Sequence, residues 1–182
     1  DDLSGHTVSI GAEESGTERN ATQILEFAGM PSSLVATKNL DYIEATKELK
    51  AGDIDAFFCT AGLTTTVIDE LSKECDIRLI PLTDTVISSL AYTSEVIPAG
   101  TYTGQTTDIS TIGVKSVLIT KADVSDDTIE QLTSLLFEKE NEISYSNSLK
   151  LELTYDFATD DIPIPFHDGA KRYYKACGYS TN

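Results

Sequence analysis

Short runs of apolar residues alternate with helical patterns over the first hundred residues of the chain. The apolar runs favour buried strands, and the segments between them place apolar side chains three or four positions apart, as an amphipathic helix does. The pattern predicts strands at "TVSIG" (7–11), "IDAFFCT" (54–60) and "IRLIPL" (77–82), and helices at 17–28, 41–51 and 64–74. Strands that alternate with helices in this way are typical of an α/β fold with a parallel-rich sheet and flanking helices.

The helical patterns also predict which side chains face the core and where the helices begin and end. Gly29 and Gly52 follow two of the patterns, at positions where glycine commonly ends a helix. Thr64 or Thr65 is suited to be the N-cap of the third helix. The positions expected to face inward are Ile24, Leu25 and Ala28 in the first helix and Ile43, Ala45, Leu49 and Ala51 in the second.

The pattern changes after residue 93. A stretch rich in Thr, Gly and Pro (94–108) predicts a long connection or an excursion at a sheet edge. The segment "STIGVKSVLITK" (110–121) then alternates as a strand does, and it is long enough to cross between two lobes.

Two more helices are expected in the last third of the chain. One has Ser125 as its N-cap, two Asp residues in its first turn and a predicted end near residue 143. The other begins near Asp168 and ends at Gly178. The inward stripe of the first of these helices would consist of Leu132, Leu135 and Leu136.

The composition excludes several classes of function. The chain has 182 residues, with 30 Asp and Glu against 13 Lys and Arg and a formal net charge of −17, so it would repel nucleic acid. No window is apolar enough to span a membrane, and the first residues do not resemble a signal peptide. Cys59, Cys75 and Cys177 are widely spaced and odd in number, which argues against a disulfide framework or a zinc site, and Cys59 is expected to be a buried thiol. We therefore expect a soluble protein with no metal and no cofactor.

The turn after the first predicted strand is the first candidate for a binding site. In "VSIGAEESGTE" the strand enters a turn bounded by Gly11 and Gly16 and then a helix. The turn lacks the Lys of a phosphate-binding loop, and its serine is not central in a G-x-S-x-G nucleophile elbow. Free backbone N–H groups and the hydroxyls of Ser15 and Thr17 suit an anionic group such as a carboxylate. The alternative is that Ser15 or Thr17 only caps the helix.

A second turn is expected at the same edge of the sheet. "CTAG" follows the apolar run "IDAFF" as "GAEESGT" follows "TVSI", and ligands of open parallel sheets bind at the carboxyl ends of strands. The small residues Thr60, Ala61 and Gly62 would let a ligand approach the backbone closely.

Groups suited to catalysis are few. His6 and His167 are the only histidines and lie far apart in the sequence, so a triad with Ser15 would require distant segments to converge. Glu13 and Glu14 can in principle do acid–base chemistry, but adjacent side chains in a turn tend to point apart. The alternative is that both glutamates are solvated and complement the helix dipole. We expect a protein that is not an enzyme.

Taken together, four segments in this order resemble the TAXI-type solute receptors that serve TRAP transporters. They are "LSGHTVSIGAEESGTE", "LKAGDIDAFFCTAG", "VIPAGTYTGQTTDISTIGVKSVLITKADVSDD" and "IPFHDGAKRYYKACGY", and they cover nearly the whole chain. The resemblance implies a periplasmic-binding-protein-like (type II) fold outside the cytoplasmic membrane. In such receptors a small carboxylate or an amino acid such as glutamate is enclosed between two lobes and handed to a TRAP membrane permease.

The resemblance also implies a division of the chain. Residues 6–108 correspond to a solute-binding lobe, and 109–182 to a crossover strand and C-terminal helices that return to the other lobe. The chain is thereby expected to represent the C-terminal portion of such a receptor.

The resemblance assigns roles to residues of both turns. Ser15, Gly16 and Thr17 would bind the ligand's carboxylate, whereas Thr60, Ala61 and Gly62 would contact its body. Tyr102, in the segment "AGTY", would be a wall or hinge residue.

Glu13 and Glu14 depart from the small residues usual at their positions in such receptors. We hypothesise that at least one of them selects a ligand with a positive group, since added negative charge would weaken the binding of a purely anionic ligand. Two other classes stay open, a ligand-sensing module of a signalling receptor and an acidic serine hydrolase.

Overall fold

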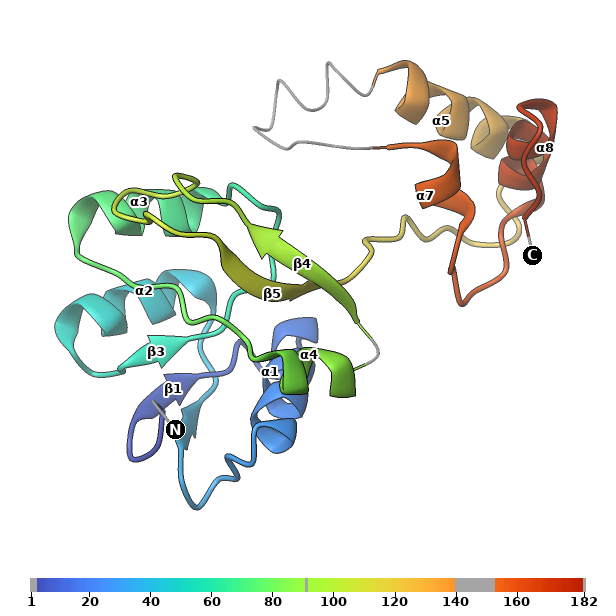
Figure 1. Ribbon diagram of the computed structural model, residues 1–182. Coiled ribbons are helices and arrows are strands. Elements are labelled where there is room, and N and C mark those ends of the chain that lie inside the picture. Colours follow the sequence, from blue (N-terminus) through green and yellow to red (C-terminus); the bar gives the residue numbers. More distant parts are fainter. Residues whose placement is uncertain (1–2, 91, 140–152, 182) are drawn as a thin grey trace. The chain divides into compact units, whose positions relative to one another are not determined.

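The chain divides into two compact units, Asp1–Lys115 and Ser116–Asn182 (Figure 1). The computed structural model describes residues 3–90, 92–139 and 153–181.

A three-stranded parallel sheet lies at the centre of the first unit. β1 (Thr7–Ser9) is the middle strand, and it pairs in parallel with β2 (Ala36–Lys38) on one side and β3 (Ala56–Phe57) on the other. Val8 and Ser9 of β1 are 0% and 1% exposed. Because parallel strands need a crossover connection, a helix follows each of the first two strands. The parallel-rich α/β arrangement predicted for this part of the chain is confirmed.

The two crossover helices begin and end where their capping residues predict. α1 (Gly16–Phe27) has Ser15 as its N-cap, and α2 (Tyr42–Ala51) begins with a capping box at Asp41. Gly52 ends α2 in the left-handed conformation, with φ of 80°.

Two further helices follow β3. α3 (Thr66–Glu74) matches the predicted helix and has Thr65 at its N-cap, although no side-chain hydrogen bond completes this cap. α4 (Asp84–Ser89) was not predicted; it begins at Thr83, whose hydroxyl accepts a hydrogen bond from the backbone of Val86. A helix this short has too little periodicity to be read from sequence.

The core of the first unit consists of two small apolar clusters. The first contains Val8, Ile10, Ala21, Leu25, Met30 and Val35; the second contains Ile24, Val86 and Leu90.

The inward positions predicted for α1 and α2 are only partly correct. Ile24, Leu25 and Ala45 are buried, whereas Ala28 and Ala51 are exposed. Leu49 is half-buried, and Ile43 is 63% exposed.

The segment predicted as a long connection begins as a strand. β4 (Thr93–Ile97) pairs in antiparallel fashion with β5 (Ile109–Gly113), which is the first part of the strand predicted over 110–121. β5 therefore belongs to the first unit. The side-chain amide of Gln105 holds the loop between them by donating hydrogen bonds to backbone carbonyls of Ile97, Pro98 and Thr107.

The third predicted strand, 77–82, is wrong. This segment carries no strand in the structure, and its described link to a neighbouring strand is one hydrogen bond from the Leu82 N–H to the Ser110 carbonyl. Pro81 supplies no N–H group, which interrupts a ladder at this point. The strand predicted over 54–60 is shortened to β3.

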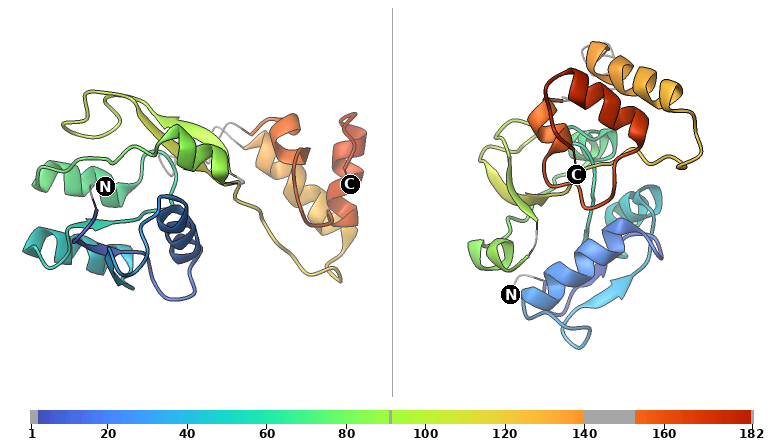
Figure 2. Two further views of the ribbon diagram at one scale, coloured as in Figure 1. Left: turned by 60° about the horizontal axis from the view of Figure 1, so that its bottom comes forward. Right: turned by 90° about the vertical axis from the view of Figure 1, so that its right-hand side faces the viewer.

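The second unit consists of helices that pack through aromatic rings. α5 (Asp126–Glu138) and α8 (Asp168–Ala176) lie side by side, and α7 (Tyr155–Thr159) precedes α8 (Figure 2). Phe137 and Tyr155 stack with ring centroids 4.5 Å apart, and further rings surround them. The remaining rings of this cluster are Phe166, Tyr173, Tyr174 and Tyr179.

The helix starts predicted at Ser125 and near Asp168 are confirmed. The predicted end of the first helix, near residue 143, lies outside the described residues. His167 is the N-cap of α8, and its Nδ1 accepts a hydrogen bond of 3.1 Å from the Gly169 N–H.

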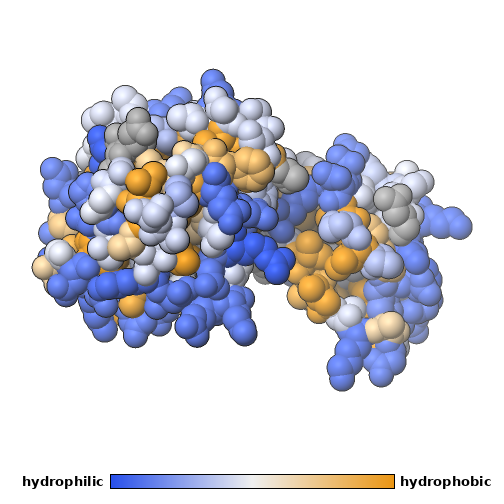
Figure 3. Space-filling view, turned by 90° about the horizontal axis from the view of Figure 1, so that it is seen from below, coloured by the Kyte–Doolittle hydropathy of each residue, from blue (hydrophilic) through white to orange (hydrophobic). Residues whose placement is uncertain are grey.

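The predicted leucine stripe of α5 is wrong at two of its three positions. Ile129 and Thr133 are the buried residues of this helix, whereas Leu132 and Leu135 are 38% and 49% exposed and Leu136 is half-buried. The hydroxyl of Thr133 is satisfied by the Ile129 carbonyl, which lets a polar side chain occupy the buried face. Figure 3 shows apolar residues gathered on one face of the second unit.

Among the described residues, no helix has the length and apolar character required to cross a membrane.

A methyl group at Gly169 should separate α8 from α5. A Cβ at this position would lie 2.2 Å from the carbonyl oxygen of Asp126, a backbone atom that cannot swing aside. We expect Gly169→Ala to destabilise the second unit by at least about 2 kcal/mol. The near-ultraviolet circular dichroism of the aromatic cluster, followed in urea, measures this loss.

Ala176→Gly, at the exposed end of α8, is the control and should cost no more than about 1 kcal/mol. An unchanged transition in Gly169→Ala would contradict the close contact of the two helices.

Candidate functional site

The turns that follow the three parallel strands meet at one edge of the first unit. β1, β2 and β3 run in the same direction, so their carboxyl ends lie together, and the N-termini of α1 and α2 follow directly (Figure 1). This edge is the usual location of ligands in open parallel sheets. The two predicted binding turns, 11–17 and 60–62, both lie here.

The turn before α1 has a tightly constrained backbone. Gly11 has φ of 99°, and a Cβ there would lie 2.8 Å from the Cβ of Thr17. Glu14 adopts the left-handed conformation with φ of 60°. The Ser15 Oγ accepts a hydrogen bond of 3.1 Å from the Glu18 N–H, so Ser15 caps α1. The capping interpretation of Ser15 is therefore confirmed, and any ligand must share this hydroxyl with the helix.

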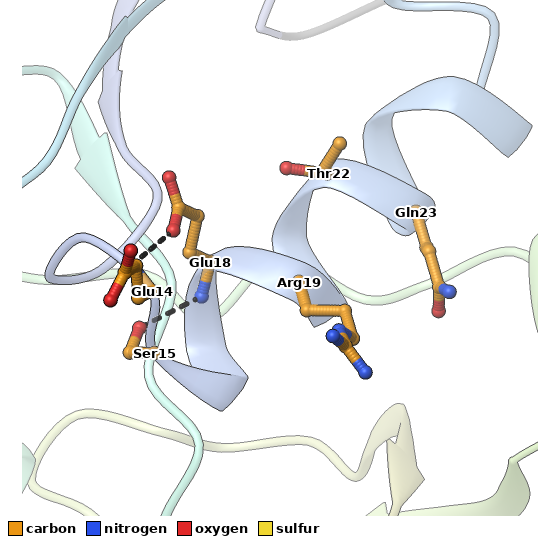
Figure 4. Close-up of a pocket in the computed structure, with 6 residues that line it drawn as sticks. All are labelled: Glu14, Ser15, Glu18, Arg19, Thr22 and Gln23. Atoms are coloured by element: carbon orange, nitrogen blue, oxygen red, sulfur yellow. Dashed lines mark hydrogen bonds between the residues drawn. The ribbon is translucent and has the colours of Figure 1, made fainter.

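Glu18 folds its carboxylate back over the same turn. It accepts a hydrogen bond of 2.6 Å from the Glu14 N–H (Figure 4). It accepts another of 2.8 Å from the Asn39 amide, which also donates to the Gly11 carbonyl. One internal carboxylate thus already occupies part of the donor set at the start of α1. The side chains of Glu13 and Glu14 are exposed.

The hydroxyl of Tyr42 joins the first turn to the second. It lies 2.7 Å from the Thr17 Oγ1, donates to the Thr60 carbonyl at 2.9 Å and accepts from the Thr60 N–H at 3.1 Å. Thr17 is buried, at 6% exposed. Its hydroxyl therefore serves the contact with Tyr42 rather than pointing into solvent.

The second turn presents small, exposed residues. Thr60, Ala61 and Gly62 are all exposed, and the Thr60 Oγ1 accepts a long hydrogen bond of 3.4 Å from the side chain of Asn20 on α1. Asn20 in turn accepts a hydrogen bond from the hydroxyl of Tyr92 at 2.9 Å.

Tyr102 supports the far end of the second turn. Its side chain is buried, and its hydroxyl donates to the Leu63 carbonyl and accepts from the Thr65 N–H at 3.3 Å. Burial raises the pKa of this hydroxyl above its ordinary value. The structure thus places Tyr102 behind the turn, where it fixes the backbone before α3.

The groups left for a ligand at this edge are mainly backbone donors. Among the hydrogen bonds of the described residues, none involves the N–H of Gly16 or Thr17. A shallow hollow of about 410 Å³ lies beside them on α1, with carboxylates and one guanidinium at its margin (Figure 4). It is lined by Glu14, Ser15, Glu18, Arg19, Thr22 and Gln23. Such a site can hold a small polar group at the helix N-terminus.

The two histidines of the described part of the chain lie in separate units. The described part of the chain contains no group of three or more His, Cys, Asp and Glu side chains placed to hold a metal ion. The Nδ1 of His6 lies 3.3 Å from a carboxylate oxygen of Asp55, and His167 belongs to the second unit. The pKa of Asp55 is lowered by the Thr7 N–H and then by His6.

Sequence reasoning missed Tyr42, Asn39, Asn20 and Glu18. Tyr42 and Asn39 follow β2, a strand that was not predicted although the short apolar run "LVA" (34–36) leads into it. A third strand at that place would have predicted a third turn at the same edge, and with it a polar side chain between the two turns that were found.

Cys59 should react far more slowly with thiol reagents than Cys177. Burial raises the pKa of the Cys59 thiol from 9.0 to about 11, while a smaller effect of the Tyr42 hydroxyl lowers it. The thiolate fraction at pH 8 is then about a hundredfold below that of an ordinary thiol, and the thiolate is the reactive form.

Cys177 is exposed on the second unit and is the internal control for this reaction. Peptide mass spectrometry after timed maleimide labelling measures both rates. Cys59 is half-buried rather than fully buried as expected, and similar rates at the two positions would contradict its raised pKa.

One comparison with known proteins identifies a family. The model of the NMT1-like family matches residues 1–178. This is a periplasmic-binding-protein-like family whose members are commonly solute-binding proteins, and its α/β fold agrees with the parallel sheet and crossover helices described above. The match covers nearly all of the sequence, and the chain therefore belongs to the NMT1-like family.

Proposed function

We propose that this protein is a TAXI-type solute-binding subunit that works outside the cytoplasmic membrane and delivers its ligand to a TRAP membrane permease. The ligand class is a small carboxylate or an amino acid, glutamate-like in size. The observation that carries the proposal is the pair of turns at one sheet edge, 11–17 and 60–62, joined through Tyr42 and flanked by free N–H groups of Gly16 and Thr17.

The hydrogen bond of Ser15, the residue that a serine hydrolase would use as its nucleophile, supports a function in binding rather than in hydrolysis. The Ser15 Oγ accepts a hydrogen bond from the helix that it caps, and His6 lies beside Asp55. A serine hydrolase needs a histidine within hydrogen-bond reach of its nucleophile. The hydroxyl of Ser15 is instead placed to define the start of α1.

The first test is a binding measurement with a designed loss of affinity. Isothermal titration of the chain with a panel of L-amino acids and small dicarboxylates should reveal saturable binding. Gly16→Ala should then lower the affinity for the ligand at least about tenfold, because a methyl group would lie over the free N–H groups of the helix N-terminus.

The fold should tolerate this substitution. A Cβ at Gly16 meets nothing within 4 Å, and alanine is favoured over glycine in a helix by roughly 0.5–1 kcal/mol. Ser33→Ala, at an exposed position in another loop, is the control. Equal affinities of the Gly16→Ala variant and the unchanged chain would place the ligand elsewhere.

The second test concerns the charge of the ligand. We propose that Glu13 or Glu14 favours a ligand with an ammonium group, since both carboxylates are exposed next to the first turn. Replacing each with Gln should lower the affinity for amino acids by roughly threefold to tenfold. The affinity for dicarboxylates should stay unchanged or increase.

Glu26→Gln, an exposed glutamate near the other end of α1, removes the same charge away from the turn and is the matched control. Equal losses for amino acids and dicarboxylates would rule out selection by these glutamates.

A further inference from the structure

We propose that Tyr42 is the positioning residue that fixes the spacing of the two ligand turns, a role that rests on the proposed binding function. Tyr42 is the first residue of α2 and is half-buried. It comes from a third strand–helix connection, between β2 and α2, and contacts both of the others. No ligand contact is assigned to it.

The Tyr42 hydroxyl has three hydrogen-bond partners in the two turns. A phenolic hydroxyl has one proton to donate and two lone pairs to accept with. The proton goes to the Thr60 carbonyl at 2.9 Å, and one lone pair accepts the Thr60 N–H at 3.1 Å. The remaining lone pair faces the Thr17 Oγ1 at 2.7 Å, so Thr17 must be the donor in that bond. These three bonds thereby have a defined direction, and the same hydroxyl also lies beside the Cys59 thiol.

This arrangement makes the two turns depend on one oxygen atom. The Thr60 backbone is held on both its donor and its acceptor side, which fixes the orientation of the peptide before Ala61 and Gly62. Thr17 is buried in the first turn of α1, beside the free N–H groups of the helix start. A shift of the Tyr42 ring would therefore move one turn relative to the other.

The arrangement also limits which donors a ligand can use. The Thr17 hydroxyl proton and the Thr60 N–H are both bonded within the protein, so neither can be donated to a ligand without breaking this group. The donors left for a ligand are the N–H groups of Gly16 and Thr17, near the exposed surface of Ala61 and Gly62. Thr17 and the Thr60 backbone thus act mainly as supports and not as donors to a ligand.

Tyr42→Phe tests the role because it removes only the hydroxyl. Nuclear magnetic resonance of the ¹⁵N-labelled chain gives the hydrogen exchange rate of individual amides. We expect exchange of the Thr60 amide to rise at least about tenfold, with no matching rise at Val8 in the central strand. A rise that is uniform over the first unit, or no rise at Thr60, would overturn the proposal.

One further variant is a control, and another replaces Tyr42→Phe if that variant does not fold. Thr133→Val removes a buried hydroxyl that bonds the Ile129 carbonyl in the second unit, and it should leave Thr60 unaffected. If Tyr42→Phe does not fold, Thr17→Val removes the donor from the same group without changing the side-chain shape. It should then raise Thr60 exchange at least about threefold, and its failure to do so would likewise overturn the proposal.

A binding measurement with L-glutamate distinguishes a failure of this proposal from a failure of the proposed function. Where the unchanged chain binds L-glutamate, Tyr42→Phe should lower the affinity at least about fivefold and Thr133→Val should not. Equal affinity of Tyr42→Phe and the unchanged chain would overturn the positioning role. Absence of L-glutamate binding by the unchanged chain would count against the proposed ligand alone, and the exchange of Thr60 would still decide the role of Tyr42.

Discussion

The parallel pairing of β1 with both of its neighbours is the constraint on which the first unit depends. Parallel strands place all their carboxyl ends at one edge, and each must be followed by a connection that returns to the other edge. Three turns from distant parts of the sequence are thereby brought together, and helix N-termini follow them. The buried positions of Val8 and Ser9 show that the middle strand is enclosed by this arrangement. The candidate site is therefore a consequence of topology before any side chain is considered.

The polar side chains at this edge form hydrogen bonds mainly within the turns themselves. Ser15 caps α1, Glu18 holds the Glu14 N–H, and Thr17 bonds Tyr42. A helix start has four unpaired N–H groups, of which the protein itself satisfies only some. Recognition at such a site thus rests on the backbone groups that remain, and the hydroxyls act by holding these groups in place. This division explains how one short turn can serve both as a helix cap and as part of a proposed binding site.

Local signals in the sequence predicted the helices well, and contacts between distant segments limited the rest. Ser15, Asp41 and Ser125 each mark a helix start through a bond to a residue three positions later, which needs no tertiary structure. The segment 77–82 shows the opposite case, because its apolar pattern suits a strand but no described ladder pairs with it. The role of Tyr42 depends on Thr17 and Thr60, 25 and 18 positions away, and no periodicity encodes such distances. The exposed Leu132 and Leu135 likewise show that α5 turns a different face toward α8 than its leucines suggest.

The electrostatics of the first turn limit the ligands that it can accept. The dipole of α1 favours a negative group by roughly 0.3–1 kcal/mol at an exposed helix start. Each carboxylate about 4 Å from that group opposes it by about 1 kcal/mol in water and about 4 kcal/mol at an intermediate dielectric. Glu18 already lies over the turn, and Glu13 and Glu14 stand beside it, whereas Arg19 is the cation at the margin of the hollow. A carboxylate that comes within that distance therefore offsets the dipole for an isolated anion, whereas a ligand that carries its own positive group would gain from it. On this balance an amino acid fits the proposed site better than a dicarboxylate does.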